Sequence, residues 1–276
     1  MLPWIAILRP LNLLQAALAV VLTTAFLGKM DQINSLVLLI LSVIAINGGG
    51  NIINDIYDLE IDRVNRPRRP LPSGAMTVTK AWGYLVFLFG SGVVLSWLIS
   101  MEAFIIAGPI SISILIAYSV WLKRLPLIGN LAVSFMLGLA FVYVGAAFDH
   151  IPTTLPMAAL AFGFTLIREI IKDLEDMNGD ARDNARTLPL IWGEKRTLGF
   201  VLILMGLFAV LDLLPYILGI YDQIYLWIVL IGINLPLLVI AIVLWGPGQK
   251  NYAGVQLFLK LDIFVGLAAL YFGRII

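Results

Sequence analysis

Long apolar runs, separated by short polar segments, are the main pattern along the chain. They predict nine helices, at 11–28, 34–56, 80–100, 103–121, 128–148, 154–176, 197–214, 223–245 and 253–273. Most of these runs reach or approach the ~18 residues that mark a membrane-spanning helix. The pattern therefore predicts an all-α, polytopic membrane protein, a bundle of nine transmembrane helices in a single domain over residues 1–276.

Composition agrees with a membrane protein and limits its chemistry. Hydrophobic residues make up 61% of the chain and charged residues 13%, against roughly 25% charged residues in soluble domains. There is no cysteine and only one histidine, His150. Disulfides, thiolate nucleophiles and zinc sites built on Cys or His clusters are therefore excluded, so any metal ion must be held by oxygen ligands. The net charge of +1 gives no sign of a nucleic-acid partner.

The basic residues are distributed unevenly between the two ends of the predicted helices. If the nine helices alternate in direction, most of the 18 Lys and Arg residues fall at the N-terminus and in the loops near 57–79, 122–127, 173–196 and 246–252. The positive-inside rule places that face in the cytoplasm. We therefore expect a multi-pass cell-membrane protein with its N-terminus inside and its C-terminus outside. Most acidic residues share this face, which the rule does not explain.

Two acidic segments on this face, residues 54–62 and 173–180, have matching patterns. Both contain the spacing D-x2-D-x3-D, followed by arginines and a Leu-Pro pair, which indicates a weak internal repeat. The aspartates are Asp55, Asp58 and Asp62 in the first acidic segment and Asp173, Asp176 and Asp180 in the second. On a continuous helix, at ~100° per residue, each set lies on one face, together with Asn54 in the first segment. For the second segment this requires the helix to continue past Asn178 and Gly179.

Solvated helix ends with acids paired to nearby arginines would explain any single aspartate. Ionised carboxylates one turn apart repel each other, however, so two such clusters favour a cation between them. Oxygen ligands without His or Cys suit Mg²⁺, which also binds substrate phosphate. Nearby Arg and Lys side chains would bind the remaining phosphate oxygens. Acids and bases at one end of an apolar bundle therefore predict a diphosphate substrate with a long apolar tail.

Prenyl transfer is the chemistry that such a site would serve. Mg²⁺ and basic side chains stabilise the departing diphosphate, and an acceptor captures the allylic carbocation. This cation needs a dry pocket, in which aromatic rings can stabilise it. The aromatic candidates are Tyr57, Tyr118, Trp121, Phe135, Phe141 and Tyr143. Packing or lipid contact is the alternative role for each.

The two acidic segments lie in stretches that resemble a known family. NDIYDLEIDRVNRPRRPLPSG resembles the first aspartate motif of the UbiA superfamily of intramembrane prenyltransferases, and REIIKDLEDMNGDARDNARTLPLIWG resembles the second. The resemblance covers essentially the whole chain and implies a cytoplasmic-side cap over the active site and two Mg²⁺ ions. The metal ligands expected on this basis are Asn54, Asp55, Asp58, Asp62, Asp173, Asp176 and Asp180, with Asp58, Asp62, Asp176 and Asp180 as the catalytic residues.

A third segment and an excess of basic residues complete the expected site. YSVWLKRLPLIGN, Tyr118–Asn130, is similar to a loop of the same family, which implies that Lys123 and Arg124 bind diphosphate. A positive-inside anchor is the alternative role for these two residues. Further expected phosphate-binding residues are Arg9, Arg66, Arg68, Arg69, Arg168, Lys172, Arg182 and Arg186. Expected substrate-pocket residues are Asn12, Asn51, Tyr57, Tyr118 and Tyr143.

Within the family, the motifs look most like the archaeal ether-lipid branch. That branch transfers a geranylgeranyl group from geranylgeranyl diphosphate to the hydroxyl of geranylgeranylglyceryl phosphate, so its acceptor is a phosphate-bearing lipid. A second phosphate agrees with the surplus of basic residues, and membrane lipids are further expected partners. Prenylation of an aromatic or chlorophyll-type acceptor is the alternative within the family. An ion-coupled transporter is a more remote one, because coupling-ion sites usually lie near the bilayer midplane.

Overall fold

The protein is described by a computed structural model that covers residues 2–182, 185–248 and 250–273, without the side chains of Asn178 and Arg182. These residues form helices and no strand. The chain divides into two compact units. Unit 1 contains residues 1–122 and 139–155, and unit 2 contains residues 123–138 and 156–276. The two units are described separately.

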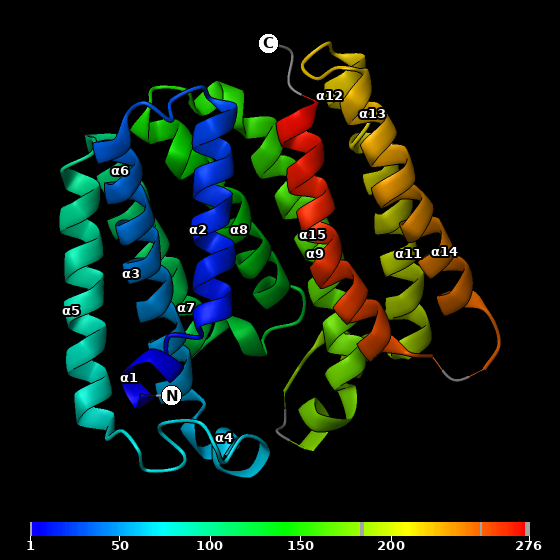
Figure 1. The fold of residues 1–276 in the computed structure, drawn as a ribbon. Coiled ribbons are helices and arrows are strands. Elements are labelled where there is room, and N and C mark those ends of the chain that lie inside the picture. Colours follow the sequence, from blue (N-terminus) through cyan, green and yellow to red (C-terminus); the bar gives the residue numbers. More distant parts are fainter. Residues whose placement is uncertain (1, 183–184, 249, 274–276) are drawn as a thin grey trace. The chain divides into compact units, whose positions relative to one another are not determined.

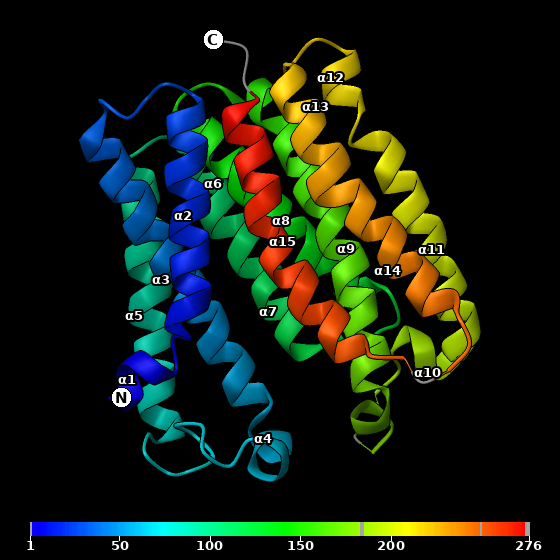
Figure 2. The same cartoon turned by 45° about the vertical axis from the view of Figure 1, so that its right-hand side comes forward.

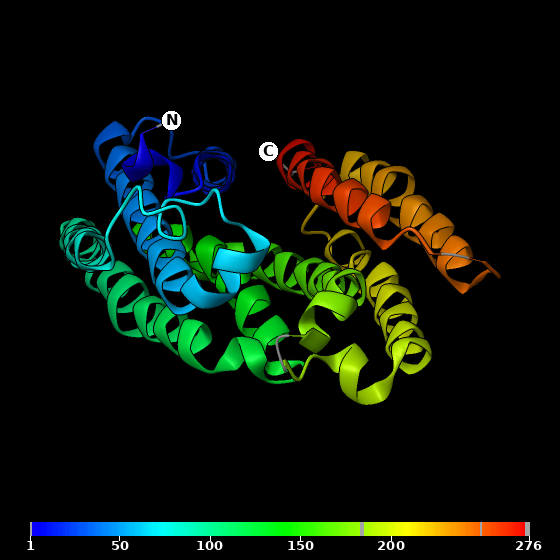
Figure 3. The same cartoon turned by 90° about the horizontal axis from the view of Figure 1, so that it is seen from below.

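Unit 1 is built around one long helix, α3. Its helices are α1 (Pro3–Ala6), α2 (Pro10–Phe26), α3 (Ile33–Tyr57), α4 (Leu59–Asn65), α5 (Val78–Trp97), α6 (Met101–Ile105), η1 (Ile106–Ile112) and α7 (Ser113–Val120). Helix α3 contacts α2, α5 and α7, and these helices run side by side in Figure 1. Viewed from below in Figure 3, α4 and the loop that leads to α5 lie at the end of this unit where α3 ends.

Glycines allow the helices of unit 1 to approach α3 closely. A Cβ atom on Gly49 would clash with the ring of Phe89 from α5, and one on Gly50 would lie 2.9 Å from Leu115 of α7. Small residues permit such close packing in membrane helices, where dispersion contacts replace the hydrophobic effect as the main attraction. The run of three glycines at 48–50 therefore fixes where α5 and α7 pack, just before the first acidic segment.

Unit 2 is a second set of long helices. After the short η2 (Leu122–Arg124), helices α8 (Ile128–Ala147) and α9 (Ile151–Arg182) contribute to both units. The remaining helices are α10 (Leu188–Trp192), α11 (Glu194–Leu211), α12 (Leu214–Ile217), α13 (Gln223–Val229), η3 (Leu230–Asn234), α14 (Leu235–Trp245) and α15 (Tyr252–Phe272). Helix α15 packs on α13 and η3, and α11 packs on α14. In Figure 2 the C-terminal end of α9 and α10 lie at one end of this unit, and α12 lies at the other.

The helices confirm the prediction of an all-helical, polytopic membrane protein. In the described part of the chain, eight helical segments are long and apolar enough to cross a membrane, and they correspond to the last eight of the nine predicted spans. The first predicted span forms α2, which has 17 residues and falls just below that length. The span predicted at 103–121 is not a uniform α-helix. Pro109 lies in η1, a π-helical turn, where the wider turn accommodates a residue without an N–H donor.

Candidate functional site

The first acidic segment lies at an interruption between two helices. Helices α3 and α4 are separated by Asp58 alone, which has φ −96° and ψ 5°. These angles fall in the sparsely populated bridge region, where many active-site residues are found. Helix α4 ends at Asn65, because Arg66 precedes Pro67 and a residue before proline disfavours the helical conformation. The expected continuous helix over residues 54–62 is therefore wrong, because it breaks at Asp58.

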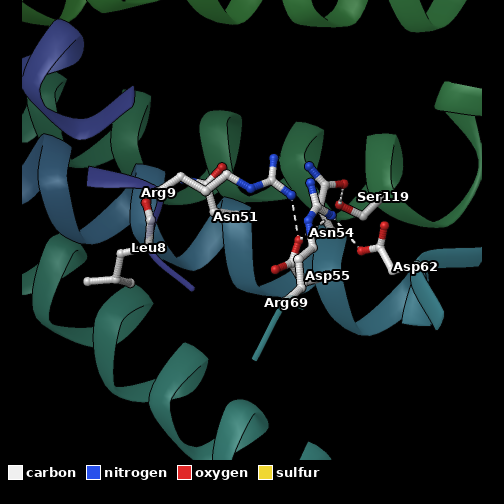
Figure 4. Close-up of polar contacts among 8 residues, drawn as sticks. All are labelled: Leu8, Arg9, Asn51, Asn54, Asp55, Asp62, Arg69 and Ser119. Carbon is white, nitrogen blue, oxygen red and sulfur yellow. Dashed lines mark hydrogen bonds and ion pairs between the residues drawn. The ribbon is translucent and has the colours of Figure 1, made fainter. Parts of the chain in front are cut away.

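Two arginines hold two of the aspartates in this segment (Figure 4). Arg9 donates a hydrogen bond from Nη2 to Oδ1 of Asp55. Arg69 donates from Nη1 to the same Oδ1 at 3.1 Å and to Oδ2 of Asp62 at 2.5 Å. The Asp55 side chain is only 3% exposed and Arg69 is 19% exposed. The structure thus brings together Asp55, Asp62 and two of the predicted phosphate-binding arginines in one buried ion-pair network.

Two asparagines of α3 are also fixed by hydrogen bonds. Ser119 of α7 donates from its hydroxyl to Oδ1 of Asn54 at 2.7 Å, which orients a predicted metal ligand. Asn51 is buried and donates from Nδ2 to the carbonyl oxygen of Leu8 at 2.9 Å (Figure 4). Asn51, expected to line the substrate pocket, therefore anchors the chain segment that precedes Arg9.

The second acidic segment has a different backbone. Helix α9 continues to Arg182, so the helix passes Asn178 and Gly179 as the shared-face prediction required. Near the start of the segment, Asn130 of α8 donates from Nδ2 to Oδ2 of Asp173 at 2.9 Å. Asp176 is exposed, in agreement with its place near the end of a long helix.

A further buried carboxylate lies one turn before this segment, on the helix face that the spacing predicts. Glu169 is 7% exposed. It accepts a hydrogen bond from the guanidinium of Arg168, and its Oε2 lies 3.7 Å from Nζ of Lys172. Gln256 of α15 donates to the carbonyl oxygen of Arg168 at 3.0 Å, which ties α15 to α9. Glu169 therefore holds two of the predicted phosphate-binding residues, Arg168 and Lys172.

The other predicted site residues differ in their exposure. Arg66, Arg68, Arg124 and Arg186 are exposed, Lys123 is partly buried, and the side chain of Arg182 lies outside the described residues. Among the predicted pocket residues, Tyr57 is exposed, whereas Asn12 and Tyr118 are partly buried.

Tyr143 is the most tightly held of the predicted pocket residues. It is 4% exposed, and its hydroxyl lies 2.6 Å from Oγ of Ser42 and 2.8 Å from Oγ of Ser96. The two serine hydroxyls are themselves 2.8 Å apart. Three hydroxyls thus form a closed hydrogen-bonded triangle that joins α3, α5 and α8 within unit 1, which gives the Tyr143 hydroxyl a structural role.

The side chains of the acidic segments fit Mg²⁺ better than a metal ion whose ligands all come from the protein. Among the described residues, no group of three or more His, Cys, Asp or Glu side chains is arranged to hold a metal ion. Mg²⁺ does not require such a group, because it usually takes one or two protein carboxylates and completes its octahedron with water and substrate phosphate. The carboxylates and the Asn54 amide are oxygen donors of the kind that this ion prefers.

Two hydrogen-bond donors, Ser119 and Asn130, were missing from the predicted site. Both lie in the segment Tyr118–Asn130, which the sequence analysis selected for its similarity to a loop of the family. Ser119 contacts Asn54 in unit 1, and Asn130 contacts Asp173 in unit 2. The signal that could have identified them is their position at the two ends of that segment, because a short polar side chain at a helix end can reach an acidic segment on a neighbouring helix.

The fold and the residues of the two acidic segments define a membrane prenyltransferase. The chain belongs to the UbiA prenyltransferase family, which its residues 15–261 match. It is 34% identical over 273 residues to "Digeranylgeranylglyceryl phosphate synthase" of Methanosphaera stadtmanae, an alignment that covers 99% of both chains.

Solved structures agree with this assignment. A structure described under "Structural and mechanistic insights into the biosynthesis of Digeranylgeranylglyceryl phosphate synthase in membranes" has a TM-score of 0.85 and 31% identity, with 98% of this chain and 97% of that chain covered. A UbiA homolog from Archaeoglobus fulgidus bound to DMAPP and Mg²⁺ has a TM-score of 0.73 and 20% identity, with 97% and 98% covered. The second likeness shows the shared fold.

Proposed function

We propose that this prenyltransferase transfers the geranylgeranyl group of geranylgeranyl diphosphate to the free hydroxyl of geranylgeranylglyceryl phosphate. The observation that carries the proposal is the 34% identity to a digeranylgeranylglyceryl phosphate synthase over 99% of both chains. The basic residues around both acidic segments support it, because the donor and the acceptor each carry phosphate. The product is an ether-linked lipid, which suits a chain made of membrane helices.

Mg²⁺ is the expected cofactor, and two ions are proposed. The residues that would hold them are Asn54, Asp58 and Asp62 in the first acidic segment and Asp173, Asp176 and Asp180 in the second. When bound, Mg²⁺ neutralises charge that develops on the departing diphosphate. The first segment presents Asp58 outside regular helix, and Ser119 fixes the Asn54 oxygen. Asp55 differs from Asp62 and Asp173, because two arginines donate to one of its oxygens.

The protein side chains would bind the phosphates and keep the reacting carbon dry. The allylic C–O bond of the donor breaks, and the bonding electrons leave with the diphosphate. The acceptor hydroxyl oxygen then forms a new C–O bond to the allylic carbocation and loses its proton. Lys123 and Arg124 are proposed partners of the diphosphate, and Arg66, Arg68, Arg168, Lys172, Arg182 and Arg186 are divided between the two phosphate-bearing substrates. Guanidinium groups suit this role, since they bind phosphate oxygens in pairs.

The proposed topology has nine membrane crossings, with the N-terminus in the cytoplasm and the C-terminus outside. Helix α2, with 17 residues, is about 25 Å long and would cross the bilayer with slight local thinning. The excess of Lys and Arg in the loops near 57–79 and 173–196 supports this orientation. Helix α4 and the loop that follows it would form part of a cytoplasmic-side cap.

A turnover assay with two acceptors tests the proposal. Purified protein with Mg²⁺ and radiolabelled geranylgeranyl diphosphate is given either geranylgeranylglyceryl phosphate or 4-hydroxybenzoate, and a third reaction receives no acceptor. We expect a labelled lipid product with the glyceryl phosphate alone. Product with the aromatic acid alone would contradict the proposed acceptor and assign the enzyme to aromatic prenylation.

A further inference from the structure

Asp55 forms ion pairs with two arginines from distant parts of the chain. Arg9 lies 46 residues before it and Arg69 lies 14 residues after it, yet both donate to the same oxygen, Oδ1. The Asp55 side chain is 3% exposed, whereas Arg9 is 31% exposed and Arg69 is 19% exposed. The carboxylate is therefore buried beneath two guanidinium groups that remain accessible.

The backbone at Arg9 supports a specific role for this arrangement. Arg9 has φ 55° and ψ 71°, in the left-handed region, immediately before α2 begins at Pro10. A residue other than glycine held in this region costs of order 1–3 kcal/mol, and such residues cluster at functional sites. Asn51 and Asp55, one turn apart on the same face of α3, hold the carbonyl of Leu8 and the side chain of Arg9. Helix α3 thus fixes the position of the Arg9 guanidinium from two points.

Asp55 is poorly suited to bind a metal ion in this arrangement. Two cations already lie at one of its oxygens, and a divalent ion there would be repelled by both. The two guanidinium groups, in contrast, have N–H donors left with which to bind an anion. Each is engaged through one terminal nitrogen, Nη2 of Arg9 and Nη1 of Arg69, which leaves the other terminal nitrogen and Nε of each outside this network. Paired N–H groups of this kind match the oxygens of a phosphate.

The corresponding aspartate of the second acidic segment has a neutral partner among the described residues. Asp173 accepts a hydrogen bond from the neutral amide of Asn130. This partner brings no positive charge to Asp173, unlike the two guanidinium groups at Asp55. The repeated spacing in the sequence does not imply the same role for Asp55 and Asp173.

We propose that Asp55 is a positioning residue that holds Arg9 and Arg69 as a pair to bind one phosphate group of a substrate. This inference rests on the proposed function and gives Asp55 a role different from that of a metal ligand. The phosphate belongs either to the prenyl diphosphate donor or to the lipid phosphate acceptor. Separate KM values for the two substrates distinguish these sources.

Whether Asp55→Asn weakens or strengthens phosphate binding distinguishes a positioning role of Asp55 from a role in balancing charge. If Asp55 merely offset positive charge, its neutralisation would strengthen phosphate binding, because the site would gain net positive charge. If Asp55 positions the two guanidinium groups, they separate when it is neutralised and phosphate binding weakens. We expect the KM of one phosphate-bearing substrate to rise about 10-fold or more, with the Mg²⁺ concentration for half-maximal activity unchanged.

Two further variants provide the comparison. Glu60→Gln is the matched control, because Glu60 lies in the same segment and pairs only with exposed Arg63 among the described residues, at 2.8 Å. An exposed pair of this kind contributes little, so we expect wild-type KM values. Asp58→Asn serves as the metal-ligand reference and should raise the Mg²⁺ requirement. If Asp55→Asn does not fold, Arg9→Gln and Arg69→Gln replace it and should raise the KM of the same substrate.

A direct binding measurement tests the same proposal without relying on turnover. The affinity of the protein for inorganic diphosphate without Mg²⁺ is measured by calorimetry in the wild type, Asp55→Asn and Glu60→Gln. About 10-fold weaker binding in Asp55→Asn alone supports the positioning role. Equal or tighter binding in Asp55→Asn overturns it, as does a raised Mg²⁺ requirement like that of Asp58→Asn. Failure of the proposed function appears separately, as absence of product from the wild-type protein.

Discussion

The two acidic segments share their spacing but differ in backbone and in the groups that hold the first aspartate. In the first segment the helix breaks at Asp58, and Asp55 accepts hydrogen bonds from Arg9 and Arg69. In the second segment α9 is uninterrupted, and Asp173 accepts a hydrogen bond from Asn130.

The partners of the two aspartates, Asp55 and Asp173, differ in charge. A carboxylate beneath two guanidinium groups has its negative charge largely balanced and presents donors for an anion. A carboxylate held by an amide gains no positive charge from that partner and remains suited to a cation. Similar spacing of aspartates therefore supports two kinds of binding, and the partner residue decides which.

Removal of one carboxylate from either segment is expected to have the largest effect. Asp58→Ala and Asp176→Ala should each lower kcat by at least about 100-fold, because the Mg²⁺ that would bind the diphosphate loses a protein ligand. Asp58 lies between two helices and Asp176 is exposed, so neither belongs to the apolar core. The midpoint of thermal unfolding should therefore stay near that of the wild type. The assay follows labelled product over time. Wild-type kcat in either variant would remove that segment from the metal site.

A smaller effect is expected from the groups that orient these ligands. Asn130→Ala removes a hydrogen bond to the Asp173 carboxylate, and Ser119→Ala removes one to the neutral amide of Asn54. Hydrogen bonds to charged groups contribute about 1.5–3 kcal/mol and neutral ones about 0.5–1.5 kcal/mol. We therefore expect kcat/KM to fall about 10- to 100-fold in Asn130→Ala and about 2- to 10-fold in Ser119→Ala. The reverse order would show that the second segment does not depend on its amide partner.

The smallest predicted effect concerns the hydroxyl triangle in unit 1. Tyr143→Phe removes one hydroxyl, but Ser42 and Ser96 remain 2.8 Å apart and can still bond to each other. We expect a loss of about 1 kcal/mol in stability, measured by thermal unfolding in detergent. The double variant with Ser42→Ala should lose less than the sum of the two single losses, because both belong to one network. Fully additive losses would contradict a coupled triangle.

Much of the fold could be predicted from the sequence, because apolar length alone identifies a membrane helix. The last eight predicted spans coincide with helical segments long enough to cross a bilayer. The differences from the predicted spans arise where single residues alter the geometry or the length of a helix. Pro109 produces a π-helical turn that hydrophobicity cannot reveal. The first helix is shorter than predicted because it ends at Phe26, close to Gly28, which has a φ of 70°.

The sequence could predict which residues belong to the candidate site, but not which of them pair with each other. The aspartates and basic residues were identified from their spacing, yet spacing alone could not show that Arg9 lies against Asp55 across 46 residues. Periodicity assumes a continuous helix, and the break at Asp58 makes that assumption fail for the first segment. Partners such as Ser119 and Asn130 depend on how helices pack, which no short motif encodes.

Binding of a geranylgeranyl thiodiphosphate, a slowly reacting analogue of the donor, tests the central claim most directly. Its dissociation constant is measured with Mg²⁺ and with EDTA in the wild type, Asp58→Asn and Asp176→Asn. We predict that Mg²⁺ tightens binding about 10-fold or more in the wild type and that each variant loses this tightening. Tightening of wild-type size in either variant would contradict the assignment of Mg²⁺ ligands to both acidic segments.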